Sequence, residues 1–245
     1  MESMKNRRSI RKYSDVEVSD ELLNDLFEVA ARASTMGNLQ LYSVIVTRDE
    51  ANKEKLSPAH FNQPMVKQAP VVLTICADYN RVVKWCEARQ AIPGYDNFQS
   101  FVAAFEDAMI FAQAFCDAAE AKGLGICYLG TTTYNADAIV EALSLPELVV
   151  PVTTLTVGFP DELPEQPERL PIAAFVHQEK YVDYDESMID ELYLEKESRP
   201  ENKEFVKVNR KQTLAQVFTD CRYTKSANEL FSEKFLELIK KQSFM

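Results

Sequence analysis

One long segment, from Phe98 to Lys122, constrains the fold more than any other part of the chain. Its apolar residues recur at helical spacing and form a wide stripe, made of Phe101, Val102, Phe105, Ala108, Met109, Ala112, Phe115, Cys116 and Ala119. Gly123 follows, and glycine is the residue that most often ends a helix. A helix that is apolar around much of its circumference must be covered. We therefore expect this helix in the core or in a subunit interface.

Short apolar runs rich in β-branched residues predict four strands, at 41–48, 69–78, 124–130 and 149–160. Further helices are predicted at 19–32, capped by Ser19, at 49–56, and at 135–145, capped by Asn135. Residues 79–98 are predicted to be irregular, with one helical turn near Trp85. These elements do not form a regular βαβα series. The glycine motifs of dinucleotide-binding and P-loop folds, GxGxxG and GxxxxGK[ST], do not occur in the sequence.

The second half of the chain changes character after the fourth predicted strand. The run "DELPEQPERLP" contains prolines that exclude both a helix and a central strand. From residue 172 onward the sequence is highly charged, with helices predicted near 187–197 and 228–242 and little order around "ESRPENKEF". The length of 245 residues suits either one large domain or two small ones.

Composition excludes several classes of protein. The net charge of -11 argues against a nucleic-acid partner, because neutralising phosphates requires a basic surface. No apolar run approaches the roughly 18–20 residues of a membrane helix, and no secretory or transit signal is recognisable, so we expect a cytoplasmic protein. The five cysteines and two histidines show no metal-ligand spacing, which predicts buried reduced thiols and no metal site. The GxSxG motif of hydrolases does not occur.

The stretch "NRRSIRKYS", residues 6–14, concentrates positive charge in an acidic protein. One interpretation is a solvated basic face ahead of a helix, since runs of charge are usually exposed. The other is a socket for an anion, because guanidinium groups match phosphate oxygens in pairs. In an extended chain, Arg7, Ser9 and Arg11 share one face, while Arg8 points to the other.

Four stretches, taken in order, carry a resemblance: "RRSIRKY" at 7–13, "ASTMGNLQLYSVIV" at 33–46, "EDAMIFAQAFCDAAEAKGLGICYLG" at 106–130 and "ERLP" at 168–171. Over roughly residues 5–180 the chain resembles the FMN-dependent nitroreductase family, in its larger branch of flavin reductases and oxygen-insensitive NADPH nitroreductases. The resemblance implies an α+β fold with a central, mostly antiparallel sheet flanked by helices. It also implies an FMN-binding core, 1–180, and a helical extension, 181–245, that belongs to the same domain and packs on the partner subunit of a homodimer.

The resemblance implies that the chain is an FMN-dependent oxidoreductase. Hydride would pass from NADPH or NADH through flavin N5 to a small-molecule acceptor, such as a nitro compound, a quinone or a flavin, in a ping-pong scheme. An alternative is a flavin-binding protein of the same fold with little reductase turnover, or with a specialised flavin or dehalogenation chemistry. Candidates for binding the 2′-phosphate of NADPH are the tail cations Arg199, Lys203, Arg210 and Lys225.

The resemblance also implies the cofactor-binding residues at the FMN, which lies between the subunits. The phosphate is assigned to Arg7, Ser9 and Arg169; Arg11 serves either the phosphate or the pyrimidine end of the ring, and Arg8 contacts the ligand through its backbone. The ring edge and ribityl chain are assigned to Ser34, Thr35, Met36, Asn38 and Gln40, and the pyrimidine to Gln63. The turn over the ring comprises Tyr128, Leu129, Gly130 and Thr131, with the Gly130 N–H directed at N5 and no side chain assigned as catalytic.

Two positions depart from the pattern of the branch. Thr131 stands where relatives often have a second glycine, and Pro167 stands where they often have a lysine. Losing that lysine removes one cation from the phosphate site, and Arg7, where some relatives have histidine, is expected to compensate.

Overall fold

The computed structural model describes residues 2–245, which form two compact units. The first unit comprises residues 2–165 together with 231–245, and the second comprises 166–230. These units do not follow the predicted division at residue 180, and whether the two predicted parts act as one domain stays a prediction.

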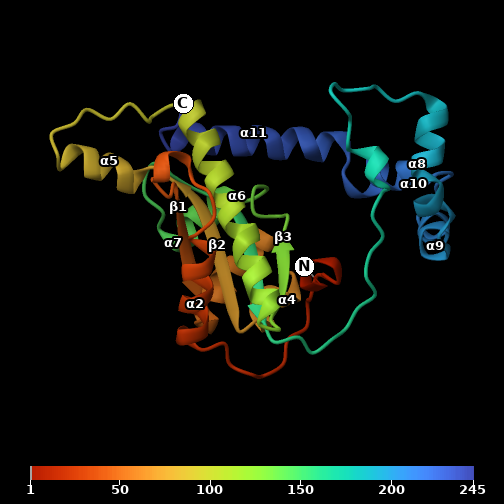
Figure 1. The fold of residues 1–245 in the computed structure, drawn as a ribbon, viewed down its shortest axis with the longest axis horizontal. Coiled ribbons are helices and arrows are strands. Elements are labelled where there is room, and N and C mark those ends of the chain that lie inside the picture. Colours follow the sequence, from red (N-terminus) through yellow and green to blue (C-terminus); the bar gives the residue numbers. More distant parts are fainter. Residues whose placement is uncertain (1) are drawn as a thin grey trace. The chain divides into compact units, whose positions relative to one another are not determined.

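The first unit is built on a four-stranded sheet (Figure 1). Its strands are β1 (Tyr42–Thr47), β2 (Val71–Asp78), β3 (Gly125–Leu129) and β4 (Val149–Gly158), in the spatial order β1-β2-β4-β3. Every neighbouring pair is antiparallel. The two central strands, β2 and β4, are buried along their whole length, which explains why their sequences are continuously apolar or β-branched. The four predicted strands and the α+β class with an antiparallel sheet are confirmed.

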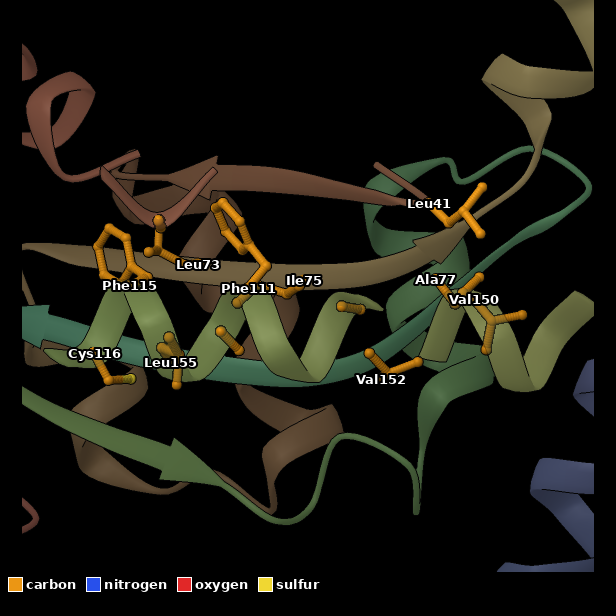
Figure 2. Packing of buried hydrophobic residues seen from close by; sticks show 14 of the residues in the cluster. Leu41, Leu73, Ile75, Ala77, Phe111, Phe115, Cys116, Val150, Val152 and Leu155 are labelled. Atoms are coloured by element: carbon orange, nitrogen blue, oxygen red, sulfur yellow. The ribbon is translucent and has the colours of Figure 1, made fainter. Parts of the chain in front are cut away.

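Helix α6 (Phe98–Ala121) packs across this sheet. Figure 2 shows Phe111 and Phe115 of α6 lying over Leu73 and Ile75 of β2. The small side chains of α6 that face the sheet, such as Ala108, are fully buried. The Asn97 side chain caps the helix by accepting a hydrogen bond from the Ser100 N–H at 3.0 Å. The predicted burial of this helix in the core is confirmed.

The remaining elements of the first unit surround the sheet: α1 (Glu2–Lys5), α2 (Asp20–Ala30), η1 (Met36–Asn38), α3 (Glu50–Leu56), η2 (Ser57–His60), α4 (Pro64–Gln68), α5 (Asn80–Glu87) and α7 (Ala136–Leu143). Helix α2 packs beside α6 and is capped by Ser19 Oγ, which accepts from the Leu22 N–H at 3.1 Å, as predicted. The short segments α1 and α4 were not predicted.

Two predictions in this unit were wrong. Helix α5 covers eight residues rather than one turn near Trp85, because Val82 and Cys86, four residues apart, both pack into the core. Asn135 precedes α7 but does not cap it with its side chain. Its amide instead donates to the Ala59 carbonyl at 3.0 Å, so tertiary contact outweighs the local capping preference.

The second unit contains η3 (Ile172–Ala174), α8 (Glu186–Ser198), α9 (Pro200–Val208), α10 (Leu214–Val217) and η4 (Phe218–Arg222). Helix α11 (Lys225–Lys241) begins in this unit, and its residues from 231 onward belong to the first. The low order predicted around "ESRPENKEF" was wrong, because Pro200 occupies the first turn of α9. Proline is favoured there, since its missing N–H would have no helical partner.

Candidate functional site

The basic N-terminal segment lies along the edge strand β3. Ser9 forms a parallel bridge with Ile126, and the Ile10 N–H donates to the Ile126 carbonyl at 3.0 Å. Gly125 permits this approach, because a Cβ at that position would lie 2.6 Å from the Ile10 side chain. Main-chain contacts therefore fix residues 7–11 at this edge of the sheet.

The positive charges of Arg7 and Arg11 both lower the pKa of the same side chain of β3, the Cys127 thiol. Burial raises the pKa of the Cys127 thiol, and the positive charges of Arg11 and Arg7 oppose that rise. The Arg7 guanidinium also lies over the ring of Tyr128, 5.9 Å from its centroid. The two cations are thus gathered beside one strand, as expected for alternate residues of an extended chain.

Arg8 does not simply point away from Arg7. Both residues line a cavity of about 170 Å³ that also borders Gly123 and Gly125. Arg8 Nε and Arg7 Nη2 are buried, and within residues 2–245 neither has a hydrogen-bond partner. Buried donors without acceptors are costly, and guanidinium groups match anions that carry several oxygens. This donor set therefore fits a phosphate group.

Glu120, near the end of α6, limits the positive charge of this cluster. Its Oε1 lies 3.3 Å from Arg7 Nε. Burial raises the pKa of Glu120, and the charge of Arg7 opposes that rise. Arg11 is different, because it is exposed and binds an acid through its backbone, whose N–H donates to Glu162 Oε1 at 2.7 Å. Arg7 thus carries a partly compensated charge, whereas the Arg11 guanidinium remains more available to a ligand.

The end of β3 and the turn that follows it carry four predicted site residues: Tyr128 and Leu129 in the strand, and Gly130 and Thr131 in the turn. Gly130 is exposed, and a Cβ built on it would meet nothing within 4 Å, so the space beside it is open. The turn is held by Thr132, whose Oγ1 donates to the Leu129 carbonyl at 2.9 Å. The Gly130 backbone is therefore presented to open space by an anchored turn.

Gln63 reaches this turn from the loop between η2 and α4. Its Nε2 donates to Thr131 Oγ1 at 3.4 Å, and His60 Nδ1 lies 2.9 Å from the same oxygen. Phe61 and Asn62, between them, have positive φ angles of 53° and 54°, so the chain reverses sharply. The structure thus brings the predicted residues Gln63 and Thr131 together and adds His60 to them.

The polar segment 34–40 is held by Asp107 of α6. The Asp107 carboxylate accepts hydrogen bonds from the Thr35 hydroxyl, from the Met36 N–H at 2.8 Å and from the Leu41 N–H at 3.1 Å. Ser34, Met36 and Asn38 are exposed, and Gln40 is half-buried. The segment leads into β1, at the opposite edge of the sheet from β3. Within one chain, it therefore approaches a different edge from the one that carries Gly130.

Arg169 belongs to the second unit, where it is exposed. Its Nη1 donates to the carbonyls of Pro167, at 3.3 Å, and Glu168, at 2.9 Å. A hydrogen bond from Lys196 is the main cause of a lowered pKa of Glu168, and Lys196 Nζ lies 2.8 Å from Glu168 Oε1. The predicted role of Arg169 at a phosphate stays a prediction.

Among the candidates for binding a nicotinamide 2′-phosphate, two differ in their surroundings. Arg199 is already paired with acids, and its Nη1 lies 3.0 Å from Glu201 Oε1. Lys203 instead lines a cavity of about 260 Å³ together with Gln212 and Thr213. Glu197 borders the same cavity, and the predicted role of these cations at a 2′-phosphate stays a prediction.

Three residues of the site region were not predicted as such: His60, Asp107 and Glu120. Asp107 is 2% exposed and occupies a buried position of α6, so a carboxylate on an apolar stripe was the available signal. Glu120 is another acidic residue of that helix, and it lies half-buried in the last turn. The sequence offers no comparable signal for His60, because its burial depends on the turn after β3.

Features typical of several other functional classes are missing from the part of the chain that the structure describes. Among residues 2–245, no group of three or more histidine, cysteine, aspartate or glutamate side chains is arranged to hold a metal ion. No helix of that range has the length and apolar character needed to cross a bilayer. The five cysteines are unpaired, and Cys221 alone among them is exposed.

Comparisons with known proteins give a consistent result. The family model described as "Nitroreductase family" matches residues 4–159. An FMN reductase [NAD(P)H] from Bacillus subtilis is 34% identical over 194 residues, which are 76% of each chain. The crystal structure of an oxidoreductase from Bacteroides fragilis has 59% identity and a TM-score of 0.99, with all of both chains covered. An NADPH:FMN oxidoreductase from Vibrio harveyi, solved with NAD+, has 27% identity and a TM-score of 0.75 over 89% of this chain and 94% of its own.

Proposed function

Since the chain belongs to the nitroreductase family, we propose that it reduces small oxidants, such as nitro compounds, quinones or free flavins, in a ping-pong scheme. It is a flavin-dependent NAD(P)H oxidoreductase with FMN as its cofactor. When bound, FMN supplies a ring atom, N5, that can accept and release hydride. The residues of this chain bind the cofactor, orient it and leave space for the reactants.

The arrangement around β3 is the observation that carries this proposal. Buried guanidinium donors of Arg7 and Arg8 are without hydrogen bonds within residues 2–245, which suits the FMN phosphate. The turn with Gly130 and Thr131 lies at the end of the same strand, next to Gln63. We assign the Gly130 N–H to flavin N5 and the Gln63 amide to the pyrimidine. Arg11 is the cation that can serve either the phosphate or the ring.

The open space beside Gly130 supports the ping-pong scheme. Because a side chain there would meet nothing within 4 Å, NAD(P)H and the oxidant can occupy the same space in turn. Such a scheme predicts parallel lines in double-reciprocal plots when both substrates are varied. Intersecting lines would show that the two substrates bind together, and would exclude the scheme.

We also propose a cytoplasmic homodimer. The segment 34–40 and the turn with Gly130 belong to opposite edges of the sheet in one chain, so a second copy offers a way to combine them in one site. Large apolar side chains exposed on α5 and α6, including Trp85 (57% exposed) and Ile110 (45%), offer surface for such contact. Light scattering at several concentrations tests the dimer, and a persistent monomer that still binds FMN would exclude it.

The central test is anaerobic reduction. The purified protein should be yellow, and adding NADPH or NADH should bleach the flavin before any oxidant is present. Stopped-flow rates with each nucleotide would then establish the preferred donor, and a panel of oxidants the acceptor. A colourless protein that takes up no FMN would overturn the proposal.

Arg169→Ala tests the predicted phosphate-binding residue that is most distant from the others in sequence. Losing a hydrogen bond to a charged group should weaken FMN binding by about 1.5–3 kcal/mol. Dialysis followed by measurement of the retained flavin gives the result, with Arg32→Ala as a control at an exposed arginine outside the site. Equal retention by the two variants would remove Arg169 from the site.

A further inference from the structure

His60 is fully buried beside the turn that follows β3, with 0% of its surface exposed. Its Nδ1 lies 2.9 Å from Thr131 Oγ1, while its Nε2 is buried and has no hydrogen bond within residues 2–245. Burying a polar ring with one unsatisfied nitrogen is costly. The contact with Thr131 is therefore the polar interaction that holds this imidazole in place.

Thr131 connects His60 to Gln63. The Gln63 side chain donates through Nε2 to the same Oγ1, at 3.4 Å. This bond determines which end of the Gln63 carboxamide faces the turn, because the nitrogen is directed at Thr131 and the oxygen is not. The three side chains thus form a chain of contacts from the buried imidazole to a predicted flavin-binding amide.

The backbone around His60 is fixed independently of this chain of contacts. The Gln63 N–H donates to the His60 carbonyl at 3.2 Å, and the Asn62 N–H to the Ser57 carbonyl at 2.9 Å. Asn135 ties the preceding residue, Ala59, to the start of α7 at 3.0 Å. Burial also lowers the pKa of His60 to about 4, so the ring is neutral at physiological pH and can either donate to or accept from the hydroxyl.

We propose that His60 is a positioning residue: it fixes the hydroxyl of Thr131, and through it the carboxamide of Gln63, in a single arrangement toward bound FMN. The inference rests on the proposed function. A free threonine side chain could adopt several rotamers over the cofactor, and the contact with His60 selects one.

The test uses substitutions that keep side-chain volume where possible. Thr131→Val removes the hydroxyl and keeps the shape, and His60→Leu removes both ring nitrogens. His60→Asn is the conservative variant, because its amide nitrogen can take the place of Nδ1. Thr154→Val is the matched control: it removes a buried hydroxyl of β4 that has no hydrogen bond within residues 2–245, without touching His60 or Gln63.

Two quantities are measured for each variant: the Kd for FMN by titration of the apoprotein, and the anaerobic rate of flavin bleaching by NADPH. Thr131→Val and His60→Leu should each raise the Kd for FMN about tenfold and slow bleaching, since each removes the contact between His60 and Thr131 that fixes this arrangement. The double variant should bind FMN no more weakly than the weaker-binding single variant, because the two substitutions remove the same interaction. His60→Asn should restore most of the affinity, and Thr154→Val should stay within about twofold of the parent.

Additive losses in the double variant would overturn the inference, as would equal effects of Thr131→Val and Thr154→Val on the Kd. If His60→Leu does not fold, the comparison of Thr131→Val with Thr154→Val and the affinity of His60→Asn still decide the matter. Failure of the proposed function looks different. In that case the parent protein itself takes up no FMN or is not bleached by NAD(P)H, whatever the variants do.

Discussion

Asp107 shows how one buried carboxylate organises a loop that is distant in sequence. It accepts hydrogen bonds from the Thr35 hydroxyl and from the N–H groups of Met36 and Leu41, at the entry to β1. A buried charge is tolerated when such donors surround it. The shape of the polar segment 34–40 therefore depends on a residue of α6 rather than on the segment alone.

Replacing Asp107 should destabilise the protein. Asp107→Ala leaves three donors near the core without their acceptor, and we expect the free energy of unfolding to fall by about 3 kcal/mol. Urea unfolding measures the change. Glu106→Ala, at the exposed neighbouring position of α6, should have little effect. Similar losses in the two variants would show that the carboxylate is not what holds the segment.

His60 should make stability depend on pH. Its folded pKa of about 4 lies below the ordinary value of 6.5, so the unfolded chain binds the extra proton between these limits. The associated stability is complete above about pH 6.5 and is lost as the pH falls toward 4, reaching about 2 kcal/mol of loss near pH 5. Comparing urea unfolding of the parent and His60→Asn at about pH 5 and pH 7.5 isolates this contribution. Identical pH dependence of the two would exclude it.

For single residues, the sequence predicts which side chains belong to the site better than it predicts which residues they contact. The alternation of Arg7 and Arg11 follows from strand geometry, and the structure places both cations beside Cys127. The pairing of Arg7 with Glu120 was not predictable, because the two residues meet only when the N-terminal segment lies beside the end of α6. His60 was missed for the same reason.

Among the elements, the pairing of the N-terminal segment with β3 determines where the arginines lie. The segment is too short and too polar to hold its place alone, and Ser9 and Ile10 attach it to Ile126. Gly125 is needed because the Ile10 side chain occupies the place of a Cβ. The position of the predicted phosphate site is thus set by strand packing.

Gly125→Ala should displace this segment. The new methyl group would overlap Ile10, so we expect a loss of about 1–3 kcal/mol in stability and weaker FMN binding. Hydrogen exchange of the Ile10 amide, which binds the Ile126 carbonyl, should accelerate. Gly94→Ala is the control, because a Cβ there meets nothing within 4 Å. Unchanged exchange at Ile10 would show that the pairing tolerates the methyl group.

The sequence predicts strands and the long helix well because their apolar patterns are long and regular, as in α6 and β4. It fails at short elements. Two residues, Val82 and Cys86, decide that α5 is helical, and they do so by contact with the core. Pro200 reads as a breaker but begins α9. In each case the deciding interaction lies outside the local sequence or depends on a helix boundary.

For the whole molecule, the last residues of the chain belong to the first unit. Phe244 is fully buried and lies 5.5 Å from Phe101 between ring centroids. Gln242 forms hydrogen bonds with the start of β4 and the residue before it: its carbonyl accepts from the Leu148 N–H at 3.0 Å, and its Nε2 donates to the Val149 carbonyl at 2.9 Å. These contacts place the C-terminal residues in the core of that unit.

Removing residues 242–245 should therefore destabilise the core. Loss of the buried Phe244 ring alone is expected to lower the free energy of unfolding by about 3–5 kcal/mol. Thermal unfolding measures the change, and removal of Met245 alone, which is 56% exposed, serves as the control. If the two truncations melt at the same temperature, the C-terminal residues do not contribute as their burial indicates.

The second unit is an excursion of the chain, which leaves the first unit at 165 and returns to it at 231. Both ends of the excursion are thus tethered to the same body. A single proteolytic cut within 166–230 would leave two fragments that each retain part of that body, and their shared core would hold them together. Limited digestion followed by gel filtration under native conditions should accordingly yield one particle, which separates into two fragments only after denaturation.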